Sequence, residues 1–449
     1  MSFRLRVRPT TGVAIGFLGV IMVGTVALMM PWASRTTPTS FLDALFTATS
    51  ATCLTGLITV DTAAHWSLAG QIIIMVLIQL GGLGFMTLAS LLGLFLAGRL
   101  GLQRRLGASA EGRGVDLGEV SWVIRATIIF TLVAEVLVTV MLAVRFHLGY
   151  GYSWGRSLWE GLFHAISSFN NAGFALYTDN VIGFALDAWI LLPLAFSLIV
   201  GGLGFPVLLE TYRRTRGTLM GIHPRRWSLT ARFTYVGTLF LIVSGTVLFA
   251  VAEWRGAFAH LGSPGAKILN AFFASVSPRT AGFNAVDYAD FHPSTLLGTD
   301  FLMFIGGGSG GTAGGVKITT AAVLLAAIIA EVKGRDAVSV HGRSIEGRII
   351  RQALAVLTAA VGMVGLSTMA ILFLAPQFTT DQILFDVVSA FATVGLSTGI
   401  TPDLPAPAQL ILIVLMYAGR VGPLVLASAL AGRSRPRQFE YPAERPFIA

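Results

Sequence analysis

The chain of 449 residues is 54% hydrophobic and only 12% charged, a composition that indicates a polytopic membrane protein and excludes an ordinary soluble enzyme. Most of the basic residues behind its formal net charge of +9 lie in segments 99–125, 213–232 and 333–351 and at the two termini, so the charge does not describe a nucleic-acid-binding surface. The single cysteine, Cys53, excludes an intrachain disulfide and any cysteine-based zinc or iron–sulfur site.

Acidic residues occupy the connections that alternate with the basic ones. The positive-inside rule then places the three basic connections and both termini in the cytoplasm, which predicts a multi-pass protein of the cell (inner) membrane. The apolar stretch 12–32 is long enough to cross the ~30 Å hydrocarbon core, and no clear small-residue cleavage site follows it. We therefore expect a first membrane helix here rather than a signal peptide. The acidic residues of the alternate connections are Asp43, Asp61, Asp179, Asp287, Asp290, Asp381 and Asp403.

The apolar segments form four successive units, each with an outer helix, a short helix, a glycine-containing loop and an inner helix. In unit one the short helix is expected to begin after an N-cap at Ser40. The other elements of unit one are expected at 12–32, 53–57 and about 68–97. The elements of unit two are expected at 120–144, 154–168, 170–174 and about 182–209.

Units three and four repeat this order. The short helices of all units have about a dozen residues, which is too few to span a bilayer, so they should be re-entrant. The elements of unit three are expected at 232–252, 265–277, 279–283 and, with an interruption, about 295–329. The elements of unit four are expected at 349–374, 381–391, 393–396 and about 405–431.

Each loop carries one glycine in a similar sequence context. A phenylalanine stands ten residues before every one of these glycines, and a bulky apolar residue follows each. One helix-breaking glycine would be ordinary membrane-helix packing, but four in register indicate four degenerate copies of one module around a central axis. The glycines are Gly56, Gly173, Gly282 and Gly395, and the serines six residues before the first, second and fourth are Ser50, Ser167 and Ser389.

We interpret these four glycine loops as a cation filter. A glycine permits the positive-φ conformations that turn peptide oxygens toward an axis. The sequence Thr-Val-Gly at 393–395 is also typical of channel filters whose backbone carbonyls replace the water shell of an ion. The short helices would aim their negative C-terminal ends at the cation. The predicted ion-binding residues are Cys53, Leu54, Thr55 and Gly56; Asn170, Asn171, Ala172 and Gly173; Arg279, Thr280, Ala281 and Gly282; and Ala392, Thr393, Val394 and Gly395.

The inner helices carry a second repeated feature, a cluster of glycines at similar distances after each loop. Units one and two have Gly-Gly-Leu-Gly-Phe at 81–85 and 201–205, and unit four has Gly-Arg-Val-Gly-Pro at 419–423. Unit three has seven glycines between 306 and 315, too many for a helix because each costs ~1 kcal/mol relative to alanine. We expect a flexible gate loop inside the membrane. The predicted gate residues are Gly306, Gly307, Gly308, Ser309, Gly310, Gly311, Thr312, Ala313, Gly314, Gly315, Lys317 and Arg420.

The predicted organisation follows from these features. It is an all-α polytopic membrane protein with four pseudo-symmetric repeats around one central pore. The pore repeats are expected at 1–98, 120–212, 232–332 (with the gate loop 306–315) and 349–432, the cytoplasmic loops at 99–119, 213–231 and 333–348, and the cytoplasmic tail at 433–449.

Four ionisable residues stand out within apolar sequence. Arg420 lies in the middle of a helix, where a charge costs at least ~2.5–3.5 kcal/mol, so we expect it to face the pore as a barrier to cations, to anchor the gate loop by bonds to its carbonyls, or both. Lys317 is expected to extend toward the cytoplasm, with assistance to the gate as the alternative. Glu135 is expected to be a packing partner rather than an ion ligand, and Arg279 to pair with an acidic residue at the pore mouth.

With these motifs the chain resembles the Trk/Ktr/HKT superfamily of potassium transporters, and most of all a bacterial KtrB-type membrane subunit. The resemblance covers essentially the whole chain: four glycine loops, the glycine-rich break in the third inner helix and Gly-Arg-x-Gly-Pro in the fourth. The chain is expected to start directly at the first unit, without the two additional N-terminal helices of the longer Trk proteins.

The resemblance implies several properties that the residues alone do not. They are potassium uptake, often with sodium dependence; a homodimer with one pore per protomer; and gating by a cytosolic RCK-type nucleotide-binding regulatory subunit. The segment 441–449 is similar to a family segment that packs at the dimer interface. Glycine at Gly56, where sodium-preferring relatives often have serine, supports potassium as the transported ion. No covalent cofactor and no nucleic acid are expected, whereas membrane lipid is an expected partner.

Three other functions fit the sequence less well. A sodium/potassium symporter of alternating-access type would usually have inverted repeats, whereas all four units here begin in the cytoplasm. A membrane enzyme would need clustered acids, histidines or a nucleophile, and the histidines are dispersed. The Gly-x-Gly-x-x-Gly pattern at 306–311 is not a nucleotide site, because it lacks a preceding strand in a βαβ unit and is followed by Val-Lys-Ile rather than Gly-Lys-Ser/Thr.

Overall fold

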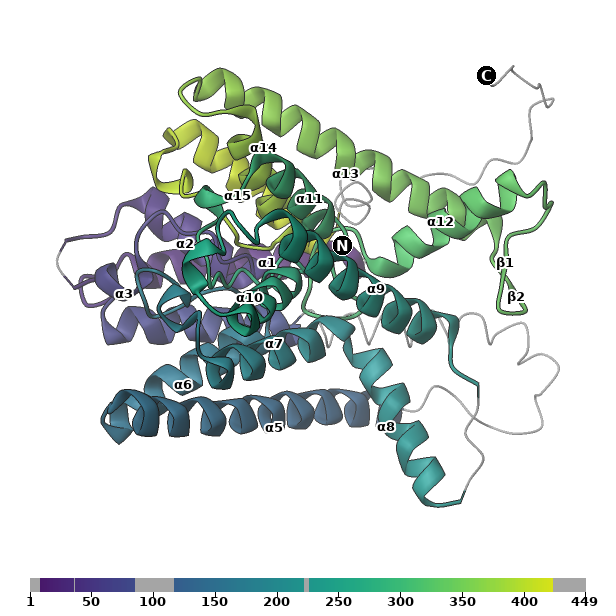
Figure 1. Ribbon diagram of the computed structural model, residues 1–449, viewed down its shortest axis with the longest axis horizontal. Helices are drawn as coiled ribbons and strands as arrows, with labels where there is room; N and C mark the ends of the chain where they lie inside the picture. The colour runs from purple at the N-terminus through teal and green to yellow at the C-terminus, as the bar shows by residue number, and fades with distance from the viewer. Residues whose placement is uncertain (1–8, 36, 85–116, 222–225, 423–449) are drawn as a thin grey trace, which may run out of the picture.

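The protein is described by a computed structural model in which residues 9–35, 37–84, 117–221 and 226–422 are placed (Figure 1). This part of the chain is mostly helical, with one short hairpin between strands β1 (Ser339–Val340) and β2 (Arg343–Ser344). Short 3₁₀ turns connect several of the helices. The prediction of a helical protein is therefore confirmed for the described residues.

Helices occupy the expected places in the described part of unit one and, except for its inner helix, in unit two. The short helix of unit one begins where the sequence predicts, after Ser40, whose hydroxyl accepts a hydrogen bond from the Asp43 amide at 3.1 Å. The helices of unit one are α1 (Pro9–Leu28), α2 (Phe41–Cys53), the single turn α3 (Thr62–His65) and an inner helix over Leu68–Gly84. Those of unit two are α5 (Leu117–Tyr150), α6 (Trp154–Phe169), α7 (Ala188–Leu203) and α8 (Phe205–Leu219).

Units three and four follow the same order. The third inner helix is interrupted at the glycine-rich segment, as the composition of that segment predicts. The helices of unit three are α9 (Leu229–Ala252), α10 (Pro264–Val276), α11 (Pro293–Phe304) and α12 (Ile318–Val332). Those of unit four are α13 (Gly347–Leu374), α14 (Thr380–Ala392) and α15 (Ala406–Val421).

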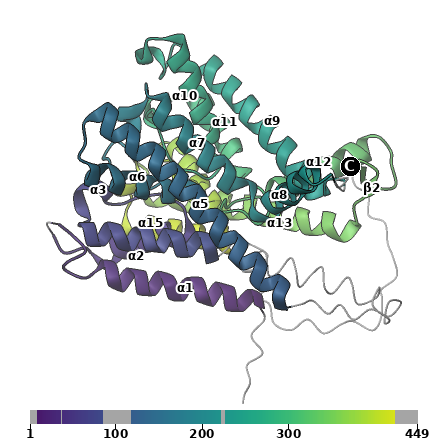
Figure 2. The same cartoon turned by 90° about the horizontal axis from the view of Figure 1, so that it is seen from below.

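The outer helices carry apolar side chains on the surface. Among the described residues, three helices are long and apolar enough to cross a membrane, Ile124–Tyr150 of α5 and the whole of α9 and α13. The side chain of Phe373 is 86% exposed and that of Val251 is 77% exposed. Large exposed apolar side chains on these helices are expected for a protein that is surrounded by lipid. α5 and α13 lie on opposite sides of the molecule, with the short helices between them (Figures 1 and 2).

The short helices α2, α6, α10 and α14 form the interior. Their C-terminal halves are almost entirely buried, although each helix has no more than 16 residues. The N-terminus of each is capped by a hydroxyl side chain, which fixes where the helix starts. The caps are Ser40, Ser153, Ser263 and Thr379.

One predicted inner helix needs correction. The inner helix of unit two is not continuous over 182–209, because it breaks at Gly204 (φ 92°) and its two parts are bent by 97°. The predicted loop 213–231 includes the end of α8 and the start of α9, and the predicted loop 333–348 contains the β1–β2 hairpin. The predicted inner-helix segments 85–97 and 423–431, most of loop 99–119 and the tail 433–449 lie outside the described residues.

Candidate ion-binding site

Three of the four short helices end in the same backbone motif. The carbonyls of Ser50, Ser167 and Ser389 each accept a hydrogen bond of 2.8 Å from the amide of the residue before the loop glycine. This is the Schellman end of a helix, in which one residue takes the left-handed conformation. That residue is normally glycine, but here it is Leu54 (φ 59°), Asn171 (φ 57°) or Thr393 (φ 52°).

The third loop, which contains Gly282, has a different hydrogen-bonding pattern at the end of its helix. Pro278 follows the end of α10, and the Ala281 amide donates to the Ser277 carbonyl at 2.9 Å, one residue nearer than in the other loops. Thr280 nevertheless has φ 70°, matching the left-handed residues of the other three loops. The Ser277 hydroxyl donates to the Phe283 carbonyl, as Ser167 does to Phe174 at 2.8 Å. A fixed six-residue spacing missed Ser277 because it stands five residues before Gly282.

The four loop glycines form a closed ring. A Cβ added at Gly56 would lie within 2.9 Å of the Ala172 carbonyl oxygen, and the same holds for Gly173 and Ala281, for Gly282 and Val394, and for Gly395 and Thr55. Each glycine therefore adjoins the backbone of the next loop, and the last adjoins the first. The structure thus brings the four predicted loops, from opposite ends of the sequence, to one place, where only glycine fits.

Buried oxygen atoms gather at this ring. The hydroxyl oxygens of Thr55, Thr280 and Thr393 are buried and have no hydrogen-bond partner among the described residues. Buried polar groups are normally paired, so unpaired oxygens at one place are suited to a cation that has shed its water. The helix ends add the negative end of their dipoles. The arrangement of these oxygen atoms can bind a cation.

A polar network lies behind the second loop. The Asn170 side-chain amide donates to Glu135 Oε1 at 3.1 Å and to Gln79 Oε1 at 2.9 Å, and Gln79 donates to Glu135 Oε2 at 3.3 Å. Glu135 is 3% exposed and lies on α5. The network thus ties the outer and inner helices to the loop, which is the packing role that the sequence predicts for Glu135.

We expect Glu135→Ala to lower the melting temperature and the uptake activity together. It leaves the Gln79 amide without its acceptor, which costs ~1–3 kcal/mol in a buried site, and it removes one of the bonds that position Asn170. Thermal unfolding in detergent and uptake by proteoliposomes would measure the two effects. The control is Glu331→Ala, because Glu331 is exposed on α12. An unchanged melting temperature for Glu135→Ala would contradict this role.

Arg279 pairs with no acidic residue in the described part of the chain, so this prediction is wrong. Its side chain is 6% exposed and donates to the Thr238 hydroxyl of α9 at 3.1 Å. The ion pairs among the described residues are instead Arg145–Asp187 and Arg156–Glu160. The guanidinium of Arg279 thus points from the loop to the outer helix α9. The residues that correspond to Arg279 in loops one and four are Cys53 and Ala392. Both are buried, and they are the last residues of α2 and α14.

The glycine-rich loop 306–315 lies beside the ring. The Gly308 amide donates to the Gly202 carbonyl at 2.8 Å, and the Phe205 amide donates to the Gly310 carbonyl at 3.3 Å, so the loop is held against the break between α7 and α8. The Thr312 hydroxyl donates to Asn171 Oδ1 at 2.9 Å. A Cβ at Gly314 would clash with the Thr393 hydroxyl. The predicted gate loop is therefore in contact with two of the four glycine loops.

Two basic side chains also hold this loop. Arg420 of α15 is 2% exposed and donates to the carbonyls of Thr312 and, at 3.1 Å, of Gly81. Lys317 donates to the carbonyls of Ala313 and Gly314. The expectation that Lys317 extends toward the cytoplasm is wrong, because the loop carbonyls, which have no helical partners, attract its ammonium group. Arg420 bonds to the loop, as one of its two expected roles requires.

Glycines of the inner helices allow close approach to the short helices. A Cβ at Gly81, Gly201 or Gly419 would overlap the carbonyl oxygen of Thr52, Phe169 or Phe391. Each of these carbonyls belongs to the residue four positions before the loop glycine of its unit. The same contact thus recurs in units one, two and four, which explains why the glycine clusters repeat in the sequence.

We expect Gly419→Ala to destabilise the protein, because the added methyl group meets backbone atoms that cannot rotate away. Overpacking of this kind costs ~1–3 kcal/mol. The melting temperature in detergent should fall, whereas Gly365→Ala on α13, where a Cβ meets nothing within 4 Å, should not lower it, because alanine favours a helix more than glycine does. Equal melting temperatures for the two variants would exclude the close contact.

The chain is similar to known cation transporters over nearly its whole length. The TrkH family model, described as cation transport protein, matches residues 7–434. The Ktr system potassium uptake protein B of Bacillus subtilis is 38% identical, with 98% of this chain and 96% of that protein covered. The potassium/sodium uptake protein NtpJ of Enterococcus hirae is 36% identical, with coverage of 98% and 97%.

A solved structure has the same fold. The potassium transporter TrkH from Vibrio parahaemolyticus superposes with a TM-score of 0.72 at 20% sequence identity, covering 96% of this chain and 87% of that one. At this level of identity the match concerns the arrangement of the helices.

Proposed function

The chain belongs to the TrkH family of cation transport proteins, and from this premise we propose that it takes up potassium through a pore whose filter is the ring of four glycine loops. The ring is the observation that carries the proposal: each glycine adjoins the backbone of the next loop, and three threonine hydroxyls there lack a partner among the described residues. Backbone and hydroxyl oxygens in this arrangement can replace the water shell of a cation. The four units would then be four repeats around one pore.

Potassium is favoured as the ion by the relatives and by Gly56. Two relatives are named for potassium uptake, the Ktr protein of B. subtilis and that of Vibrio alginolyticus, which is 39% identical over 96% of this chain and 93% of that protein. The E. hirae relative is named for both potassium and sodium. We propose potassium as the main substrate, with sodium as a co-substrate or activator.

Closure of the pore is assigned to loop 306–315. The loop lies against two glycine loops and is held by Arg420 and Lys317, so its displacement would open the path. The chain would form a homodimer and be gated by a cytosolic RCK-type regulatory subunit, as its resemblance to KtrB-type proteins implies. Both termini would lie in the cytoplasm of a bacterial cell.

The second candidate function is a sodium/potassium symporter of alternating-access type. The name of the E. hirae relative favours it. The two functions differ in stoichiometry: a symporter couples a fixed number of sodium ions to each potassium ion, whereas a pore carries potassium along its own gradient. Potassium flux into proteoliposomes without sodium on either side supports the pore and opposes the symporter.

The proposed function is tested by rescue of a bacterium that lacks potassium uptake. Cells that express this chain should grow at low potassium, and a co-expressed RCK subunit should increase the uptake of rubidium, a tracer for potassium. A variant with Gly395→Ala, in which the methyl group meets the first loop, is the inactive control. Failure to grow despite normal membrane expression would reject potassium uptake.

A further inference from the structure

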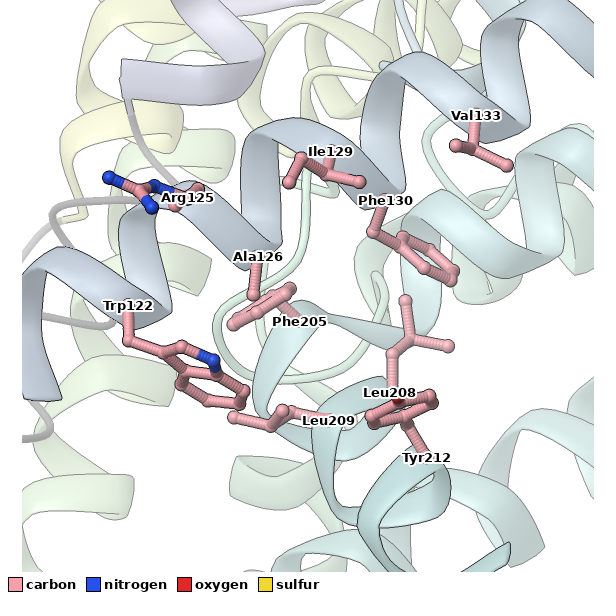
Figure 3. Close-up of a pocket in the computed structure, with 10 residues that line it drawn as sticks. All are labelled: Trp122, Arg125, Ala126, Ile129, Phe130, Val133, Phe205, Leu208, Leu209 and Tyr212. Carbon is pink, nitrogen blue, oxygen red and sulfur yellow. The ribbon is translucent and has the colours of Figure 1, made fainter. Parts of the chain in front are cut away.

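We propose that an anionic phospholipid of the cytoplasmic leaflet binds in a groove between α5 and α8. The groove has a volume of about 360 Å³ (Figure 3). Its lining is apolar and aromatic except for Arg125, the one charged side chain among its lining residues. The acyl chain would lie along the apolar lining, and the phosphate would meet the arginines at the end of the groove.

The walls of the groove are exposed although they are apolar. Ile129 is 54% exposed and Val133 62% exposed on α5, and Tyr212 is 57% exposed on α8. The two helices diverge because the chain bends by 97° at Gly204, so that α8 runs away from the bundle (Figure 1). A space of this kind between two helices in a membrane is suited to an acyl chain.

The charge at one end of the groove selects the headgroup. Arg125 is exposed, and the guanidinium of Arg213 lies 5.0 Å from the centre of the Trp122 ring. These residues belong to the ends of α5 and α8 that join the basic connections, which the positive-inside rule places in the cytoplasm. The inner leaflet carries anionic lipids that attract arginine, and tryptophan favours the same depth. A phosphate group between two arginines, with a fatty chain below it, matches this distribution better than a protein segment does.

The groove is connected to the glycine-rich loop through one residue. Phe205 lines the groove and is 4% exposed, and its amide donates to the Gly310 carbonyl at 3.3 Å. A lipid that packs on Phe205 would thus stabilise the α7–α8 bend and the loop conformation it holds. This step, unlike lipid binding itself, rests on the proposed role of loop 306–315 as a gate.

Native mass spectrometry of the delipidated protein tests the binding. The protein should retain phosphatidylglycerol more strongly than phosphatidylcholine, and Arg125→Gln with Arg213→Gln should weaken phosphatidylglycerol binding about thirtyfold, as expected for ~1 kcal/mol per arginine. The matched control is Arg348→Gln with Arg351→Gln, two exposed arginines of α13 that lie away from the groove. Equal retention of the two lipids, or equal loss in both double variants, would overturn the proposal.

Ala126→Trp provides a second variant that keeps both arginines. Ala126 lines the groove, so the indole should fill it and displace the acyl chain, lowering phosphatidylglycerol retention. A cross-link from Ile129→Cys to a second copy of the chain would overturn the proposal, because the groove would then be a protein contact.

Rubidium uptake by vesicles of phosphatidylcholine, with and without phosphatidylglycerol, tests the link to the loop. The unmodified protein should change its uptake severalfold with phosphatidylglycerol, and the groove variants should not. Lipid binding is measured without transport. Absence of uptake in all vesicles would therefore reject the proposed function and not the lipid site, and uptake that ignores the lipid would reject the coupling.

Discussion

Gly56→Ser is expected to reduce the discrimination between potassium and sodium by about tenfold, which corresponds to ~1.4 kcal/mol in the difference between the two ions. Gly56 has φ 93°, a conformation that a residue with a Cβ adopts only under strain. The added Cβ would lie 2.5 Å from the Ala172 carbonyl oxygen and 3.1 Å from Gly173 Cα. The serine must therefore displace either its own loop or the second one.

Displacement changes selectivity more than it changes permeation. A ring whose oxygens fit potassium loses its preference for potassium when one of its four loops moves. A partly hydrated sodium ion, in contrast, can still bind at an irregular site. Competition of sodium with rubidium uptake in proteoliposomes gives the ratio directly. Gly365→Ser on the open face of α13 is the matched control. Wild-type discrimination in Gly56→Ser would remove the first loop from the filter.

The arrangement of the helices could be predicted because the information is local and repeated. Neighbouring residues in the sequence indicate each of these features: the glycine loops in register, the short helices with hydroxyl caps and the glycine-rich break at 306–315. The same holds for Ser40, whose capping role depends on residues within one turn. The sequence also indicates the break at Gly204, since Pro206 is typical of the first turn of a new helix. We predicted a continuous helix because unit one has the same Gly-Gly-Leu-Gly-Phe motif without this proline.

The directions of the buried side chains could not be predicted, because their partners are distant in the sequence. Arg279 meets a hydroxyl 41 residues away, and Arg420 bonds to a carbonyl 339 residues away. The general rule that a buried basic side chain pairs with an acidic residue gave the wrong partner for Arg279. Near a glycine-rich loop, unpaired carbonyls compete for cations, as they do for Lys317.

Arg420→Ala is expected to open the path and increase the rubidium flux of the purified protein about tenfold to a hundredfold, the range that corresponds to ~1.5–3 kcal/mol for a lost hydrogen bond of a charged donor. The guanidinium joins the Thr312 carbonyl of the loop to the Gly81 carbonyl of the first inner helix. Without it, the seven-glycine segment loses a link to the bundle, and its high conformational entropy favours displacement.

Arg420→Lys separates the two roles that a cation can have here. Lysine keeps the positive charge but lacks the planar fork that reaches two carbonyls at once. High flux in both variants indicates that Arg420 acts by anchoring the loop, whereas high flux in Arg420→Ala alone indicates that the charge itself repels cations. Arg35→Ala is the control, since Arg35 also donates to a backbone carbonyl, that of Trp66 at 3.0 Å, but lies outside the loop. If both Arg420 variants fold and keep the wild-type flux, other contacts of the loop, such as those of Gly308 and Lys317, are what hold the path closed.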